Sequence, residues 1–211
     1  MTEVRHPIFA RLYARFSADE EAKGGAELRD ELLAGLAGRV VEVGAGHGLN
    51  FAHFPIAVTE VVAIEPEPHL RELASEAAAR APVPVTLVDG VADSLPLPDA
   101  SCDAAVCSLV LCSVADPDAA LAEVRRVLRP GGGLRFYEHV LADTPGLARV
   151  QRVINVAHPL LAGGCHITRD TEAAIERAGF EIVRIRRFRF APMLPSKHVS
   201  PKILGTARLP S

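Results

Sequence analysis

The chain has 211 residues, of which 49% are hydrophobic, and a net charge of −3. This length and composition predict one domain over residues 1–211 with a full core. The acidic balance excludes a general electrostatic attraction to nucleic acid, so we expect no nucleic-acid partner. No run approaches the ~18 apolar residues of a membrane span. The N-terminal stretch MTEVRHPIFARLY lacks the apolar region of a signal peptide. We therefore expect a cytoplasmic protein without an integral membrane segment.

Two helices are predicted before the first strand. The first covers residues 7–17, where the apolar residues at helical spacing are Phe9, Leu12, Tyr13 and Phe16. Such a stripe is typical of a packing helix, but three of the chain's ten aromatic residues lie in it. We therefore expect a lid over a ligand site. The second helix covers about 19–36 and is expected to stop at Gly38.

A glycine-rich turn follows the first predicted strand. The β-branched run over 40–43 predicts a buried strand, interrupted by Glu42, which needs a polar partner that a bound ligand would supply. Gly44, Gly46 and Gly48 follow this strand and alternate with Ala45 and His47. Glycine permits a sharp turn and lets a ligand approach the backbone. Residue 49 is Leu, so the spacing differs from the G-x-G-x-x-G pattern of nicotinamide-binding proteins.

An acidic residue ends the next predicted strand. Glu65 closes the run VVAIEP and lies 21 positions after Gly44. A carboxylate about 20 residues beyond the glycine turn is placed to accept hydrogen bonds from both ribose hydroxyls of a nucleoside. The two features together predict a nucleoside-binding α/β domain.

The remaining chain alternates helices and strands. We predict helices over about 66–80 and 116–128, and a helix-rich region over 145–178 that is broken near Gly163 and Gly164. Strands are predicted at 83–89, 103–111, 133–140, 181–188 and 202–208. This alternation predicts a parallel sheet with helices on both faces. Ligands of such sheets bind beyond the carboxyl ends of the strands. The residues expected to meet there are Gly44, Glu65, Asp89, Cys107, Ser108, Glu138 and His139.

The four cysteines do not indicate a metal site. Cys102, Cys107 and Cys112 are five residues apart, and Cys165 lies far along the chain. This is not the C-x-x-C spacing of zinc sites. We favour reduced cysteines that pack as small hydrophobic residues, with a redox or metal role as the alternative, and we expect no metal.

Several motifs resemble those of class I S-adenosylmethionine (SAM) methyltransferases: VVEVGAGHGLNF, AIEP, SLPLPDASCD and AEVRRVLRPGGGLRFYEHV. The ubiquinone and menaquinone C-methyltransferases share this plan. AVCSLVLCSV, RRVLRPGG, EHV, GCHITRDT and PKILGTA are more similar to the methyltransferase-like thiol S-methyltransferases of animals. The animal proteins resemble membrane-anchored forms with an apolar N-terminal segment, which this chain lacks. The likeness covers about Val40 to Ala207.

The resemblance implies a Rossmann-like fold with a seven-stranded, mostly parallel sheet and helices on both faces. It implies an N-terminal lid at 1–37, a SAM-binding core at 38–140, a substrate-side helical region at 141–180 and C-terminal strands at 180–211. It also implies SAM-dependent methylation, with S-adenosylhomocysteine as product and a small-molecule thiol as acceptor.

The same resemblance implies a set of cofactor-binding residues. They are Glu42, Gly44, Ala45, Gly46, Gly48, Asn50, Glu65, Pro66, Asp89, Gly90, Val91, Ala92, Cys107, Ser108 and Leu109. Relatives often bind the adenine amine with an Asp where this chain has Val91. Asp89, Asp93 or a backbone group is therefore expected to take that role.

Three residues are candidates for the chemistry at the acceptor. His139, at the tip of the fifth strand, is either a general base or a histidine that orients Glu138 or a loop. His166 either lines the acceptor pocket or lies on the surface, and Tyr13 either faces the acceptor or packs in the core.

Other functions remain open from the residues alone. An N- or C-methyltransferase acting on a phospholipid amine or a quinone is one, and a non-catalytic SAM-binding protein is another. The basic residues of 184–189 indicate either recognition of an anionic substrate or the charged edge of a sheet, and we favour the edge.

Overall fold

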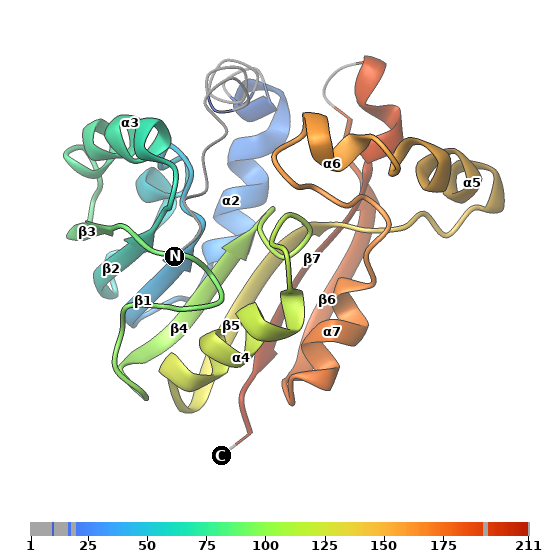
Figure 1. Ribbon diagram of the computed structural model, residues 1–211. Helices are drawn as coiled ribbons and strands as arrows, with labels where there is room; N and C mark the ends of the chain where they lie inside the picture. The colour runs from blue at the N-terminus through green and yellow to red at the C-terminus, as the bar shows by residue number, and fades with distance from the viewer. Residues whose placement is uncertain (1–9, 11–16, 18–19, 192–193, 211) are drawn as a thin grey trace.

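A seven-stranded sheet forms the centre of the computed structural model, which describes residues 10, 17, 20–191 and 194–210 (Figure 1). The strand order is β3-β2-β1-β4-β5-β7-β6. Strand β7 runs antiparallel to both of its neighbours, and the other paired strands are parallel. The strands are β1 (Gly38–Val43), β2 (Val58–Ile64), β3 (Val85–Val88), β4 (Cys102–Ser108), β5 (Leu128–His139), β6 (Glu181–Arg189) and β7 (Pro201–Arg208). This sheet matches the fold expected from the sequence.

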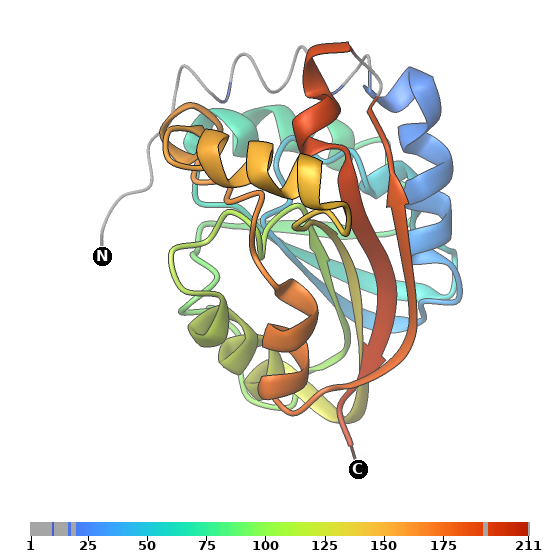
Figure 2. The same cartoon turned by 90° about the vertical axis from the view of Figure 1, so that its right-hand side faces the viewer.

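Helices cover both faces of the sheet (Figure 2). The longer ones are α2 (Ala26–Leu33), α3 (Pro68–Ala78), α4 (Pro117–Val127), α5 (Pro145–Ile154) and α7 (Thr171–Arg177). The shorter ones are η1 (Glu21–Gly25), η2 (Phe51–His53), α6 (His158–Leu161) and η3 (Leu194–Val199). Both α5 and α6 lie beyond the carboxyl end of β5, next to the ligand edge that the sequence predicts (Figure 1).

Two hydrophobic cores, one on each face of the sheet, are formed where the helices pack against the strands. Leu33 of α2 and Ala74 of α3 pack with Val40 and Val61 on one face. On the other face, Leu121 of α4 and Ile175 of α7 join the core that contains Val41. Neighbouring residues of β1 thus enter opposite cores because side chains alternate along a strand. Burial on both faces explains why valines occupy consecutive positions of this strand.

The predicted helix over 19–36 is wrong at both ends of α2. Lys23 and Gly24 have non-helical backbone angles inside η1, with φ +111° at Gly24, so the helical segment is kinked just before α2. The helix ends at Leu33 because Ala34 is extended, with ψ 132°. Gly38 does not stop the helix but begins β1. All four residues of the proposed lid stripe, Phe9, Leu12, Tyr13 and Phe16, fall outside the described residues, so the lid stays a prediction.

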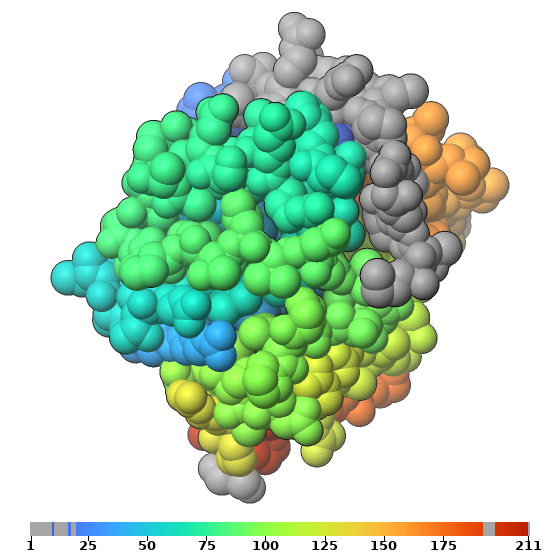
Figure 3. Space-filling view, turned by 60° about the vertical axis from the view of Figure 1, so that its left-hand side comes forward, coloured from blue at the N-terminus to red at the C-terminus, as the bar shows by residue number. Residues whose placement is uncertain are grey.

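Two strand boundaries also differ from the prediction. Strand β4 ends at Ser108 rather than at residue 111, because Leu109 has φ +60° and turns the chain. Strand β5 begins at Leu128 rather than at residue 133, so Gly131 and Gly132 lie within the strand. The segment that follows β3 lies on the molecular surface, below α3 in Figure 3.

The basic residues of β6 lie at the sheet edge, as the sequence analysis favoured. Arg184 and Arg186 pair with Glu31, and Arg187 pairs with Glu172. These charges are therefore used in ion pairs that cover an edge strand. Within the described part of the chain, no helix has the length and apolar character needed to cross a membrane.

Candidate functional site

The glycine turn after β1 requires glycine at specific positions. Gly44, Gly46 and Gly48 have φ of +65°, +58° and +84°, a region that L side chains rarely adopt. A Cβ at Gly44 would lie 2.6 Å from Cγ2 of Val110. The turn is therefore packed tightly against the segment that follows β4, at the carboxyl edge of the sheet.

Glu65 holds this turn from the tip of β2. Its Oε2 accepts a hydrogen bond from the Gly46 N–H at 2.8 Å, and its Oε1 accepts one from the Glu67 N–H at 2.9 Å. The residue is 5% exposed, and burial raises the pKa of its carboxyl. Each carboxylate oxygen retains a second lone pair. The carboxylate can therefore accept further hydrogen bonds, and binding of ribose by Glu65 stays a prediction.

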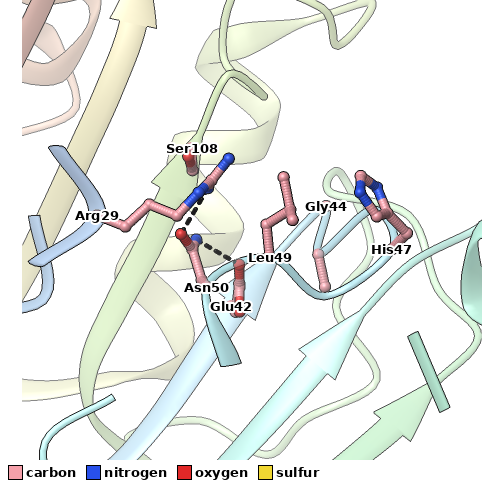
Figure 4. Close-up of a pocket in the computed structure, with 8 residues that line it drawn as sticks. Arg29, Glu42, Gly44, His47, Leu49, Asn50 and Ser108 are labelled. Atoms are coloured by element: carbon pink, nitrogen blue, oxygen red, sulfur yellow. Dashed lines mark hydrogen bonds between the residues drawn. The ribbon is translucent and has the colours of Figure 1, made fainter. Parts of the chain in front are cut away.

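A small polar cavity of about 20 Å³ lies beside the glycine turn (Figure 4). It is lined by Arg29, Glu42, Gly44, Ala45, His47, Leu49, Asn50 and Ser108. Asn50 Nδ2 donates to Glu42 Oε1 at 2.7 Å, and Arg29 Nη1 donates to Asn50 Oδ1 at 2.7 Å. These bonds link α2, the glycine turn and β1 in one chain. The cavity has room for about one water, so a larger ligand requires it to open.

Glu42 carries the polar group that a ligand would complete. The residue is 2% exposed, and within the described part of the chain its Oε2 has no hydrogen-bond partner. Burial raises the pKa of this carboxyl from 4.5 to about 7, while the bond from Asn50 and the charge of Arg29 lower it. An unpaired buried carboxylate is costly. A cationic group beside Glu42 and an anionic group beside Arg29 would together suit the α-amino and α-carboxyl groups of an amino-acid moiety, as in SAM.

Other predicted cofactor residues lie in different settings. Asp89 is exposed, and its carboxylate lies 3.3 Å from Arg71 Nη1. Val91 forms a bridge with Ser94, and a Cβ at Gly90 would lie 2.9 Å from Pro96. The side chain of Cys107 is fully buried in the core, so only its backbone is available to a ligand. Those of Pro66 and Ala92 are partly buried.

Glu138 supports the turn that follows β4. Its carboxylate accepts hydrogen bonds from the backbone N–H groups of Val110, Leu111 and Cys112 at 2.9–3.0 Å. The residue is 0% exposed, and burial raises the pKa of its carboxyl well above the usual value. The alternative role for His139, orientation of Glu138, has no support in these contacts, because backbone groups orient that carboxylate.

His139 instead contacts two thiols. Its Nδ1 lies 3.6 Å from Cys112 Sγ and 3.5 Å from Cys165 Sγ, and the two sulfurs are 3.7 Å apart. Contact with Cys165 and burial raise the pKa of the Cys112 thiol to about 12. His166 donates its backbone N–H to Cys112 O, while its imidazole lies 3.4 Å from Asn155 Nδ2. Cysteine spacing did not foresee this cluster because its two thiols are 53 residues apart in the sequence.

Sequence reasoning also missed two cations near the ligand edge. Arg29 lines the cavity although it belongs to a helix that we assigned to the lid region. Lys202 of β7 is 3% exposed, and its Nζ donates to Tyr137 Oη at 2.7 Å and to Glu20 Oε1 at 2.9 Å. Burial lowers the pKa of its ammonium group. A lysine inside the apolar run of β7 was the available signal.

Comparison with known proteins agrees with this fold. The family described as a methyltransferase domain matches residues 41–136. A putative methyltransferase from Bacillus halodurans superposes with a TM-score of 0.71 at 19% identity, covering 88% of this chain and 98% of that one. A possible histamine N-methyltransferase from Thermotoga maritima gives 0.69 at 22% identity, covering 95% and 96%. The chain thus has the Rossmann-like fold of these structures.

Curated relatives place it more narrowly. Human thiol S-methyltransferase TMT1B is 36% identical over 83% of this chain and 73% of its own length. Human thiol S-methyltransferase TMT1A is 37% identical, again over 83% of this chain and 73% of its own length. The chain is therefore a SAM-dependent methyltransferase, and it belongs to the family that contains these two enzymes.

Proposed function

We propose that this enzyme transfers the methyl group of SAM to the sulfur of a small-molecule thiol. The observation that carries the proposal is the 36% identity to human thiol S-methyltransferase TMT1B, which extends over 83% of the chain. The likeness includes the cofactor edge and also the segments around Cys112, His139 and Cys165 at the acceptor side.

On the donor side, the residues present fit SAM. When bound, SAM supplies a methyl group activated by its positively charged sulfur. Glu42 Oε2 would accept a hydrogen bond from the ammonium group, and Arg29 would face the carboxylate. Glu65 would accept the ribose hydroxyls, while the backbone of the glycine turn approaches the ligand without side chains in the way. Asp89, Asp93 or a backbone group would bind the adenine.

On the acceptor side, the chain has to align and deprotonate a thiol. Displacement at a methyl group requires the attacking and leaving atoms to lie in line, which is a matter of positioning. A free thiol has a pKa of about 8.5, and its thiolate is the nucleophile. Burial, with smaller effects of Arg169 and His158, lowers the pKa of His166, so this imidazole is largely neutral near pH 7 and able to accept a proton. His139 and Tyr13 stay alternative candidates for this role.

A methyl-transfer screen tests the proposal directly. Purified protein and radiolabelled SAM would be offered aliphatic and aromatic thiols, matched amines and phenols, a phospholipid amine and a quinone. We expect thioether products from thiols, at a rate that rises with pH until the thiol is ionised. The S-methylated form of each thiol serves as a control that has no free sulfur nucleophile. Methylation of amines or quinones without thiol turnover would overturn the proposal.

A further inference from the structure

Cys112, His139 and Cys165 have the mutual spacing of metal ligands. The three ligand atoms are separated by 3.7, 3.6 and 3.5 Å. A tetrahedral zinc ion with the usual Zn–S and Zn–N bond lengths holds two sulfurs about 3.8 Å apart, and a sulfur and a nitrogen about 3.6 Å apart. The observed triangle therefore matches one face of such a coordination tetrahedron.

Hydrogen bonds to the backbone hold the segments that carry Cys112 and Cys165 in place. Glu138 fixes the turn that carries Cys112, and Arg169 Nη1 donates to Leu111 O at 2.6 Å. The His166 N–H donates to Cys112 O at 2.7 Å, which ties the Cys165 segment to the same turn. A Cβ at Gly164 would lie 2.6 Å from Ser113 O, so glycine is needed for this close approach. Ligands held on a rigid frame are a requirement of a metal site.

We propose that Cys112, His139 and Cys165 bind one zinc-class ion, and that its open fourth position takes the sulfur of the acceptor thiol. Two sulfurs and an imidazole suit a borderline-soft d¹⁰ ion. Within the described ranges, no fourth His, Cys, Asp or Glu joins the group. Three protein ligands are typical of zinc sites that keep a position for water or substrate. The proposal replaces the metal-free site that cysteine spacing predicted.

The position of the cluster fits an acceptor site. His139 is the last residue of β5, and Cys112 lies four residues beyond the end of β4. Ser108, which lines the donor cavity, is in register with Tyr137, two residues before His139. The metal and the donor cavity would thus lie at the same edge of the sheet. The identity of the fourth ligand as a thiol rests on the proposed function.

Binding of the thiol at this ion is a simple exchange. The S–H bond of the acceptor breaks, and a sulfur–metal bond replaces the bond between the ion and a water molecule. The water and the proton leave to solvent, with no change of oxidation state. A thiol that coordinates such an ion loses its proton at neutral pH. The ion would thereby supply the nucleophile that the methyl transfer requires.

A disulfide switch explains the geometry less well. It would join only the two sulfurs, at about 2.05 Å, and would leave the imidazole unused. It would also require an oxidant. Thiol hydrogen bonds alone are weak, and here a single imidazole nitrogen faces two sulfurs.

Metal content is the first test, and it needs no SAM. Untagged protein purified without chelators should contain about one zinc per chain by elemental analysis. After replacement with Co²⁺, it should show thiolate-to-cobalt charge transfer and the intense visible bands of tetrahedral cobalt. Cys165→Ser and His139→Gln should weaken metal binding at least about tenfold. Cys102→Ser is the matched control, because Cys102 is fully buried and lies outside the cluster.

The fourth position is tested on the cobalt protein. Adding 2-mercaptoethanol should shift the visible bands, and its S-methyl ether should not. A folded wild-type protein that binds neither metal would overturn the site, while thiol methylation by that protein would leave the proposed function intact. If 2-mercaptoethanol does not shift the cobalt bands, the proposal that the ion binds the acceptor thiol is overturned. Normal cobalt spectra in a protein that methylates no thiol would instead reject the proposed function.

Discussion

The carboxylate of Glu65 accepts the backbone N–H of Gly46 at 2.8 Å, so the tip of β2 fixes the glycine turn that follows β1. The residue expected to bind ribose therefore also shapes the loop beside it. Any substitution of Glu65 changes both functions. Variants have to be chosen so that the two effects are separated.

Glu65→Ala should weaken SAM binding at least about tenfold and should also destabilise the protein. The change leaves the N–H groups of Gly46 and Glu67 without their acceptor, at a cost of about 1–3 kcal/mol each. Glu65→Gln keeps one oxygen and should fall between alanine and wild type in stability. Calorimetric titration and urea unfolding measure the two effects. Unchanged SAM affinity in a folded alanine variant would place the ribose elsewhere.

Glu42→Gln should remove a pH dependence. The carboxyl has a pKa of about 7 in the folded chain against 4.5 ordinarily, so ionisation opposes folding. The free energy of unfolding of the ligand-free wild type should fall as pH rises from about 4.5 to 7, by up to about 3 kcal/mol, and then level off. Because ionised Glu42 attracts the SAM ammonium group, SAM affinity should rise about tenfold between pH 6 and 8 relative to the variant. Parallel pH profiles for both proteins would contradict this role.

Gly44→Ala should destabilise the turn by about 1–3 kcal/mol. Its φ of +65° is unfavourable for alanine, and the new Cβ would lie 2.6 Å from Val110. Val110→Ala in the same chain relieves the clash but not the backbone strain, so recovery should be partial. Thermal unfolding of the single and double variants distinguishes the two terms. Full recovery would mean that backbone strain contributes nothing measurable.

Glu138→Ala should be among the most damaging single changes. It leaves three buried N–H groups of the 110–112 turn without an acceptor, which costs about 3 kcal/mol or more in total. Glu123→Ala removes a carboxylate that accepts the Leu95 N–H in a more open position, and it serves as a comparison. Urea unfolding should show a much smaller loss for Glu123→Ala. Equal losses would show that the turn does not depend on the buried carboxylate.

Deleting residues 1–17 tests the lid. Ala10 and Ser17 are buried, and Ser17 Oγ lies 3.1 Å from His47 Nε2 in the glycine turn. A covering segment would exclude water from the methyl group. Deletion should reduce methyl transfer strongly and SAM binding only in part. Full activity of the truncated protein would contradict the lid, and Tyr13→Phe then separates proton transfer from packing in the full chain.

The fold and the glycine turn held by Glu65 followed from local sequence patterns. The β-branched run, the glycines and Glu65 lie close in sequence, so their arrangement in one edge was predictable. The ends of α2 and β4 could not be predicted in this way. They depend on the backbone conformations of Ala34 and Leu109 rather than on hydrophobic periodicity.

The acceptor side was only partly predictable. His139 was a candidate, but its contacts with Cys112 and Cys165 depend on how three distant segments pack. Arg29 likewise enters the cavity from a helix with no motif of its own. Residue type singled out His139 alone among these side chains. The cysteines were expected to pack as small hydrophobic residues, and Arg29 was not considered, so only tertiary structure brought their contacts to light.

The placement of β7 between β5 and β6 affects how the chain folds during synthesis. All other strands leave the ribosome before Pro201, yet β6 has no partner in the sheet until β7 inserts. Until then, β5 presents an unpaired edge that other nascent chains can join. Polypeptides that terminate before residue 201 should accumulate as aggregates rather than as smaller folded domains, and a chaperone that shields exposed strands should raise the yield of the complete enzyme.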